Sequence, residues 1–73
     1  MILKEVEAEI TGSVWKIEVT EGQKVEEDDV LLIIESMKME IPLLSTIAGV
    51  VKEIRVKEGE DLQEGKVAVI IEE

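Results

Sequence analysis

An internal repeat constrains the fold of this sequence more than any other feature. Residues 12–35 align with residues 49–72 without a gap, at an offset of 37 (49 − 12), and 11 of the 24 aligned positions are identical. The identical pairs are Gly12/Gly49, Val14/Val51, Ile17/Ile54, Val19/Val56, Glu21/Glu58, Gly22/Gly59, Glu27/Glu64, Val30/Val67, Ile33/Ile70, Ile34/Ile71 and Glu35/Glu72. Similar strands alone can give apolar matches, but the paired Glu-Gly steps and opening glycines are harder to obtain that way. The sequence therefore predicts two equivalent halves in a pseudo-two-fold arrangement.

Each half predicts the same succession of short strands. The first half reads as a strand over Ser13–Thr20, a Glu-Gly turn, a polar segment with one apolar residue, Val25, and a strand over Val30–Glu35. The second half repeats this order with Val50–Lys57, Leu62 and Val67–Glu72. β-Branched residues bounded by glycines and acidic turns favour strands, and Val30–Ile34 is apolar on every face, unlike an amphipathic helix. Short strands at this spacing indicate an all-β sandwich or barrel.

The ends of the chain complete this arrangement. Ile2–Glu9 is predicted to add one strand, paired with Glu40–Leu44 or with the symmetry equivalent of that segment. The last strand of the first half leads into Lys38, and the equivalent strand of the second half leads to Glu73. Symmetry therefore predicts that Lys38 lies at one end of the molecule and both termini at the other.

The centre of the sequence departs from ordinary hairpin chemistry. Two strand-like runs, Val30–Ile34 and Ile41–Leu44, flank the polar link Glu35-Ser36-Met37-Lys38-Met39-Glu40 and predict a hairpin. Short hairpin links need positive φ and usually contain Gly or Asn, but this link has neither and offers a lysine between two methionines. A local rule broken at a conspicuous place suggests a functional role.

The segment Glu35–Glu40 resembles the attachment site of biotinyl domains, whose hallmark is Met-Lys-Met with biotin on the lysine. The resemblance covers nearly the whole chain. It implies a flattened β-barrel of two antiparallel sheets with an internal pseudo-two-fold repeat, the barrel-sandwich hybrid of biotinyl and lipoyl domains. It also implies covalent biotin on Lys38 at the hairpin tip. Met37, Met39, Glu35, Ser36 and Glu40 are then the flanking recognition residues.

The resemblance implies a biotin carboxyl carrier, not an enzyme. A biotin protein ligase would biotinylate Lys38, and the carboxybiotin arm would shuttle CO2 between biotin carboxylase and carboxyltransferase sites. The residues themselves support a passive role. An unperturbed lysine amine is almost entirely protonated at neutral pH, and reactive lysines need burial or a cationic neighbour, which this segment does not offer. We therefore predict that Lys38 is the substrate of a modifying enzyme and that the chain has no catalytic residues.

Two observations narrow the kind of carrier, and three alternatives remain. Lipoyl domains share this fold but typically have Asp before and Ala after the lysine, so Met37 and Met39 favour biotin. The sequence contains neither a Pro/Ala-rich linker nor the insertion that forms a thumb in the carrier of bacterial acetyl-CoA carboxylases, so the resemblance is to a free-standing member. The alternatives are a lipoyl-type acyl or aminomethyl carrier, an unmodified structural or adaptor module, and a small enzyme.

Composition bounds the other classes. Residues 1–73 are enough for one domain, and the absence of Cys and His excludes zinc sites and catalytic triads built on them. The net charge of −10 argues against nucleic acid and anionic membranes and favours basic patches on protein partners. No apolar run has the length of a membrane span or a signal peptide. We expect a cytoplasmic monomer.

The remaining features have plainer interpretations. Trp15, aligned with Lys52, is predicted to be a partly buried edge residue, with a partner-facing patch as the alternative. Glu26-Glu27-Asp28-Asp29 lacks the alternating ligands and central Gly of a calcium loop, so we predict a solvated turn and no metal site. The five glycines are predicted to serve turns or bulges, and Pro42 restricts its strand to an edge.

Overall fold

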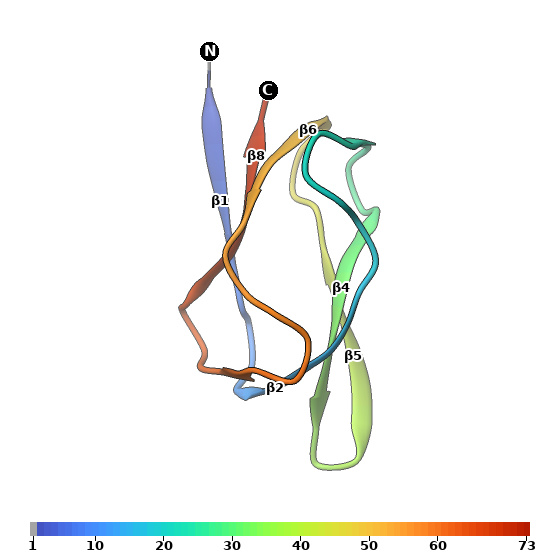
Figure 1. The fold of residues 1–73 in the computed structure, drawn as a ribbon, viewed down its shortest axis with the longest axis vertical. Helices are drawn as coiled ribbons and strands as arrows, with labels where there is room; N and C mark the ends of the chain where they lie inside the picture. Colours follow the sequence, from blue (N-terminus) through green and yellow to red (C-terminus); the bar gives the residue numbers. More distant parts are fainter. Residues whose placement is uncertain (1) are drawn as a thin grey trace.

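Eight strands and no helix make up residues 2–73, the part of the chain that the computed structural model describes (Figure 1). The strands are β1 (Leu3–Glu7), β2 (Gly12–Ile17), β3 (Lys24–Val25), β4 (Val30–Ser36), β5 (Met39–Leu44), β6 (Gly49–Ile54), β7 (Asp61–Leu62) and β8 (Val67–Glu72). They form two antiparallel four-stranded sheets, with orders β1-β8-β6-β3 and β5-β4-β2-β7. The predicted all-β fold, a flattened barrel of two antiparallel sheets, is confirmed.

The two sheets are equivalent strand by strand. An offset of 37 converts the pairing of Leu3 with Glu72 into the pairing of Glu40 with Glu35, in the opposite sense along the chain. The offset likewise relates β6 to β2 and the two-residue strands β3 and β7 to each other, although β3 pairs with β6 and β7 with β2. Each half therefore donates its short strand to the sheet of the other half, and the predicted pseudo-two-fold arrangement is confirmed.

The predicted pairing of the N-terminal strand was wrong. β1 pairs with β8, and β5 pairs with β4. The physical reason is the symmetry itself: the segment Leu3–Glu7 is the equivalent of Glu40–Leu44, so it pairs with the equivalent of β4. The first strands of the two halves are also shorter than predicted. β2 ends at Ile17 and β6 at Ile54.

Bulges explain why the final strand of each half is apolar at successive positions. The register of β4 against β5 shifts between Val30 and Leu32, so both Leu31 and Leu32 point into the core and are fully buried. The equivalent residues of β8, Ala68 and Val69, are also fully buried. Burying a leucine side chain contributes about 1.5–3 kcal/mol. A strand with bulges can therefore add more to a small core than strict alternation allows.

The repeated Glu-Gly turns fasten the halves to each other. The Gly22 N–H donates to the Val51 carbonyl at 2.7 Å, and the Gly59 N–H donates to the Val14 carbonyl at 2.7 Å. The glutamates before these glycines act in the same crossed way. Glu21 Oε2 accepts from the Ile54 N–H at 3.0 Å, and Glu58 Oε2 accepts from the Ile17 N–H at 2.9 Å. Both glycines have φ near +90°, a conformation that glycine adopts without the penalty of a Cβ.

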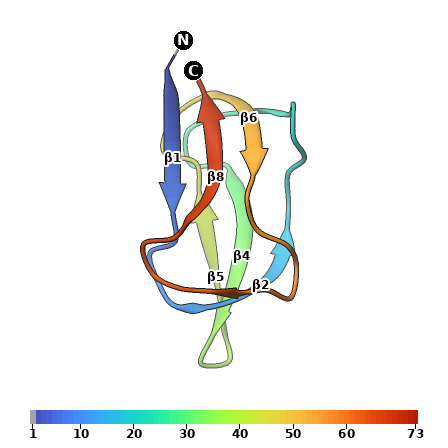
Figure 2. The same ribbon diagram turned by 60° about the vertical axis from the view of Figure 1, so that its left-hand side comes forward.

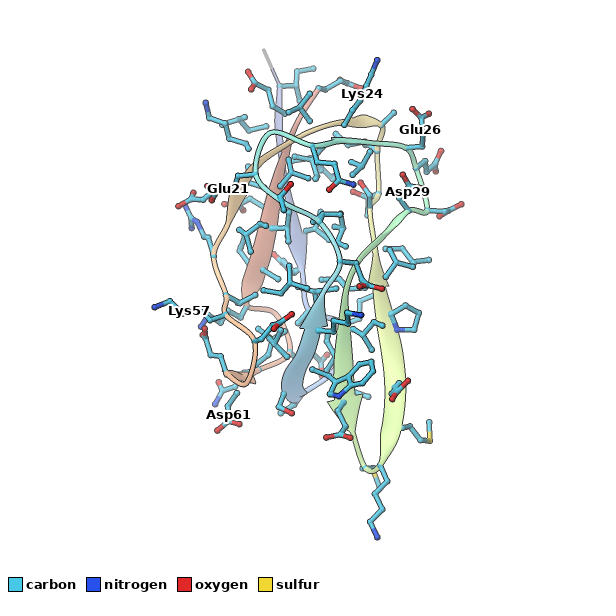
Figure 3. The ribbon with its side chains drawn as sticks, turned by 45° about the vertical axis from the view of Figure 1, so that its right-hand side comes forward. Glu21, Lys24, Glu26, Asp29, Lys57 and Asp61 are labelled. Atoms are coloured by element: carbon cyan, nitrogen blue, oxygen red, sulfur yellow. The ribbon has the colours of Figure 1, made fainter. Side chains whose placement is uncertain are left out.

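The molecule is elongated, with extents of 36 × 17 × 17 Å. The β4–β5 hairpin projects at one end, and both termini lie at the other end (Figures 1 and 2). Figure 3 shows the charged side chains of Glu21, Lys24, Glu26 and Asp29 toward the end that is opposite the hairpin. The predicted separation of Lys38 from the termini is therefore observed.

Candidate functional site

The candidate site is the tip of the β4–β5 hairpin. Ser36 pairs with Met39 at the last rung, so Met37 and Lys38 alone form the loop. Both loop residues have positive φ, 53° for Met37 and 64° for Lys38. Two consecutive positive φ angles are the pattern of the type I′ turn, which usually takes Asn-Gly because most residues other than Gly, Asn and Asp are strained there. The sequence thus places its central lysine on a strained turn.

The side chains of the tip face solvent. Met37 is 90% exposed and Met39 is 60% exposed, and Lys38 between them is exposed as well. The three ion pairs found within residues 2–73 are Lys16–Glu18, Arg55–Glu53 and Lys66–Glu60, and none involves Lys38. The Lys38 amine is therefore free to meet another protein.

Glu35 and Glu40 lie directly opposite each other across the hairpin, one rung below the Ser36–Met39 pair. Both are exposed. Like charges at opposite positions on neighbouring strands are destabilising. This pair of glutamates therefore places negative charge next to the tip and makes the pairing of β4 with β5 less stable.

Ser36 anchors the tip end of the hairpin. Its hydroxyl donates to the Thr11 carbonyl at 2.9 Å, and the Thr11 hydroxyl accepts from the Glu64 N–H at 3.0 Å. Thr11 thus connects the hairpin to the final turn of the second half. Sequence reasoning missed Thr11. A signal was present, because its repeat equivalent is Ala48, which has no hydroxyl.

Gly12 supports the hairpin for a reason that differs from the predicted one. A Cβ at Gly12 would lie 2.3 Å from the Glu35 carbonyl oxygen, and a Cβ at Gly49 would lie 2.4 Å from the Glu72 carbonyl oxygen. These two glycines therefore permit close approach to the backbone of the neighbouring strand, β4 for Gly12 and β8 for Gly49, whereas Gly22, Gly59 and Gly65 have positive φ as expected of turn residues. The prediction that all five glycines serve turns or bulges was wrong for Gly12 and Gly49.

The other predicted features lie away from the tip. Asp29 Oδ2 accepts from the Glu26 N–H at 2.8 Å, so the acidic run closes its own turn. In residues 2–73, no group of three His, Cys, Asp or Glu side chains is arranged to hold a metal ion.

Pro42 lies on β5, which is an edge strand as predicted. Trp15 is 47% exposed, more open than the predicted partly buried edge residue. Residues 2–73 contain no helix that could cross a membrane.

Comparison with known proteins gives a consistent result. The family described as "Biotin-requiring enzyme", the biotin/lipoyl family, matches residues 4–71. A biotinylated protein TB7.3 homolog from Mycobacterium leprae is 49% identical over 45 residues, which cover 62% of this chain and 63% of that protein. A biotin/lipoyl attachment protein from Bacillus subtilis is 42% identical over 40 residues, or 55% of each chain. The matches thus span less than two thirds of these relatives.

The fold also matches part of a solved enzyme. The crystal structure of Kluyveromyces lactis urea carboxylase superposes with a TM-score of 0.92 and 32% sequence identity, over 97% of this chain and 6% of that one. The similarity to this much larger protein is thus confined to one small part of it. With a family match that extends from β1 to β8, the chain belongs to the biotin/lipoyl attachment-domain family of biotin-requiring proteins.

Proposed function

We propose that this protein is a biotin carboxyl carrier in which a biotin protein ligase acylates Lys38. One observation carries the proposal. Lys38 occupies the exposed tip of a two-residue turn at positive φ, between two exposed methionines. A strained backbone at a projecting tip is a feature that a scaffold does not need for its own stability. Family membership supplies the chemistry that fits such a lysine.

The residues present fit covalent attachment of biotin. The neutral Lys38 ε-amine would attack the carboxyl carbon of biotinyl-adenylate. The amide C–N bond would form as the bond from that carbon to the adenylate oxygen breaks and AMP leaves, and the ligase would supply the activated biotin and the base that accepts the amine proton. The acylated side chain is uncharged and long, reaching roughly 12–15 Å from the backbone by standard bond lengths. When bound, biotin supplies a ureido nitrogen that carries a carboxyl group between two enzyme sites.

The residues around Lys38 have separate roles in this proposal. Met37 and Met39 offer flexible, polarizable side chains that adapt to the pocket of another protein. Glu35 and Glu40 keep the tip solvated and anionic, and Ser36 holds the tip end of β4 to Thr11. The chain itself acts as a non-catalytic monomeric carrier, and we infer that its location is cytoplasmic.

The proposed partners are a biotin carboxylase and a carboxyltransferase. The similarity to part of the Kluyveromyces lactis urea carboxylase supports this choice. Because the hairpin projects at the end opposite both termini, the arm of Lys38 has unhindered access to a partner. Tethering the cofactor to a small carrier raises its local concentration at both sites.

The proposal is tested by intact mass spectrometry after co-expression with a biotin protein ligase. We expect one biotinyl group per wild-type chain and none on Lys38→Arg, while Lys52→Arg, which changes another exposed lysine, is modified like the wild type. The proposal fails if Lys38→Arg still gains the group, or if the wild-type chain gains none from a ligase that modifies an established substrate.

The same mass measurement, repeated after co-expression with a lipoate ligase, addresses the alternatives. The family includes lipoyl domains, and the Bacillus subtilis relative is described as a biotin/lipoyl attachment protein. Modification by a lipoate ligase, and not by the biotin ligase, would identify the protein as a lipoyl carrier. An unmodified wild-type chain under both conditions would favour a structural or adaptor module.

A further inference from the structure

The outer face of the sheet that carries the hairpin has a row of apolar side chains. Ile33 of β4 is opposite Pro42 of β5 on one side and opposite Lys16 of β2 on the other, and Trp15 is the extra residue of the β2 bulge next to Lys16. Ile33 lies outside the core cluster, Pro42 is exposed, and Trp15 is 47% exposed. Leu44, also on β5, extends the row and is 37% exposed. We name Trp15, Ile33, Pro42 and Leu44 the apolar face.

The equivalent face of the other sheet serves as an internal comparison. The offset of 37 replaces Trp15 by Lys52, Ile33 by Ile70, Pro42 by Glu5 and Leu44 by Glu7. Ile70 again has partners on both sides, Glu5 and Glu53. Its exposure is only 6%, although it too lies outside the core cluster. The same backbone arrangement thus accepts charged residues at three of the four positions.

The fold therefore does not require the apolar face. The second sheet does expose apolar side chains, Leu3 and Val50, but they lie two rungs nearer the termini than Ile70, on either side of Glu72. An apolar row beside the hairpin, absent from an otherwise equivalent surface, is typical of a contact site for another protein.

Acidic side chains border the apolar face at both ends. Glu35 and Glu40 lie two rungs toward the tip from the Ile33–Pro42 pair. At the other end, Pro42 and Leu44 line an open hollow together with Glu27 and Asp28. Lys16, which lies opposite Ile33, is itself paired with Glu18 at 3.8 Å. A complementary partner surface is thus apolar at its centre and carries lysine or arginine at its border.

The position of the apolar face relative to Lys38 limits which partner uses it. Pro42 on β5 lies four residues after the loop residue Lys38, about 13 Å at about 3.3 Å per residue. An ordinary protein interface covers roughly 800 Å² on each partner, so one protein can cover both the tip and the face. An enzyme that acylates Lys38 must bring its active site to the amine itself. A later partner needs only to meet the end of an arm of roughly 12–15 Å.

We propose that the apolar face is the docking surface for the enzyme that acylates Lys38, and that this enzyme contacts it with an apolar depression bordered by lysine or arginine side chains. The proposal rests on the proposed function and adds the surface that delivers Lys38 to the ligase active site. Trp15 is its main anchor, because large aromatic side chains dominate the binding energy of such contacts.

The test compares two reciprocal variants of the full chain. Trp15→Lys and Lys52→Trp each introduce the residue that the other sheet carries at the same bulge, so the backbone is suited to both. With a biotin ligase that modifies the wild type, we expect Trp15→Lys to reduce kcat/KM for the chain about tenfold through KM, with kcat retained. We expect Lys52→Trp to retain the wild-type kcat/KM. Trp15→Phe, which keeps an aromatic ring at this position, should have a kcat/KM much closer to that of the wild type than to that of Trp15→Lys. Melting temperatures identify any variant that fails to fold.

Two further measurements sharpen the test. Pro42→Glu, which introduces the residue found at the equivalent position Glu5, weakens acylation in the same direction, and added salt raises KM for the wild type because the acidic border is screened. The inference is overturned if Trp15→Lys is acylated with wild-type kcat/KM, or if Lys52→Trp loses as much. A Trp15→Lys chain that is acylated normally but fails in carboxyl transfer assigns the face to a later partner and also overturns it. Absence of any acylation of the wild type refutes the proposed function instead.

Discussion

The hairpin end and the terminal end of this molecule are two versions of one structure. At the hairpin end, β4 and β5 are joined by Met37-Lys38, with both residues at positive φ. At the terminal end, the equivalent strands β8 and β1 are not joined, and the Glu73 N–H donates to the Ile2 carbonyl at 2.8 Å. Asp28 also has positive φ, 73°, at the position equivalent to Gly65, but within residues 2–73 two consecutive non-glycine residues at positive φ occur only at the tip that presents the lysine. Strain localised in this way indicates a functional position more than a requirement of the scaffold.

The departures from the repeat follow the same division. Thr11, which accepts hydrogen bonds from the Glu64 N–H and from the Ser36 hydroxyl near the hairpin tip, corresponds to Ala48. Trp15 on the face beside the hairpin corresponds to Lys52. The core positions, by contrast, are buried in both halves. The scaffold positions are therefore alike in the two halves, and the residues that differ between the halves form the surroundings of the hairpin site.

The largest expected effect comes from Gly12 and Gly49, the two glycines that lie against a backbone carbonyl oxygen of the neighbouring strand. Gly12→Ala and Gly49→Ala each place a Cβ against a backbone carbonyl oxygen, and each is expected to lower the free energy of unfolding by about 3 kcal/mol. Only Gly12→Ala displaces Glu35, one rung below the Ser36–Met39 pair that closes the hairpin, so only this variant slows ligase-catalysed acylation of the folded fraction. Urea unfolding and acylation rates measure the two effects. Equal acylation rates for the two variants would break the distinction between the ends.

A smaller effect is expected at the turn. Met37→Asn places a residue that tolerates the left-handed region at φ 53°, so the free energy of unfolding rises by about 0.5 kcal/mol. The same substitution slows acylation because it removes a proposed ligase contact. Thermal unfolding of Met37→Asn in the Lys38→Arg background provides the control, since a backbone effect is independent of the lysine. A loss of stability would show that the turn is not strained at Met37.

The smallest effect concerns an exposed carboxylate. Glu60 accepts from Lys66 Nζ at 2.6 Å, and this hydrogen bond, followed by that from the Lys57 N–H, lowers the pKa of Glu60. Gln23, its equivalent, keeps the backbone contact, accepting from the Thr20 N–H at 3.1 Å. Glu60→Gln should therefore remove only the ion pair and lower the melting temperature slightly at neutral pH.

The pH dependence of that difference has a definite sign. A carboxyl whose folded-state pKa is depressed stabilises the fold above its unfolded-state pKa, and the contribution disappears as the pH falls through the folded-state pKa. Melting curves of wild type and Glu60→Gln should thus differ at neutral pH and converge in acid. Added salt should also reduce the difference, because the pair is exposed. A gap that persists in acid would mean that the ion pair is not its source.

The sequence predicted much of this structure from local chemistry. The repeat predicted the pseudo-symmetry, and β-branched runs between Glu-Gly turns predicted the strands. The unusual link around Lys38 predicted the exposed hairpin tip. The pairing of β1 was beyond local reasoning, because a strand's own residues do not specify which of two equivalent neighbours it joins. The role of Gly12 was missed for the same reason, since its contact is with Glu35, far along the chain.

What the sequence by itself determined is the list of parts: two equivalent β units and one lysine in a link that breaks the usual turn preferences. These are properties of short segments, governed by side-chain shape and backbone sterics. Only the tertiary structure decided that Trp15, Ile33 and Pro42 share one outer face, and that the equivalent face is charged. That grouping depends on the register and bulges of three strands, which are set by packing of the whole core.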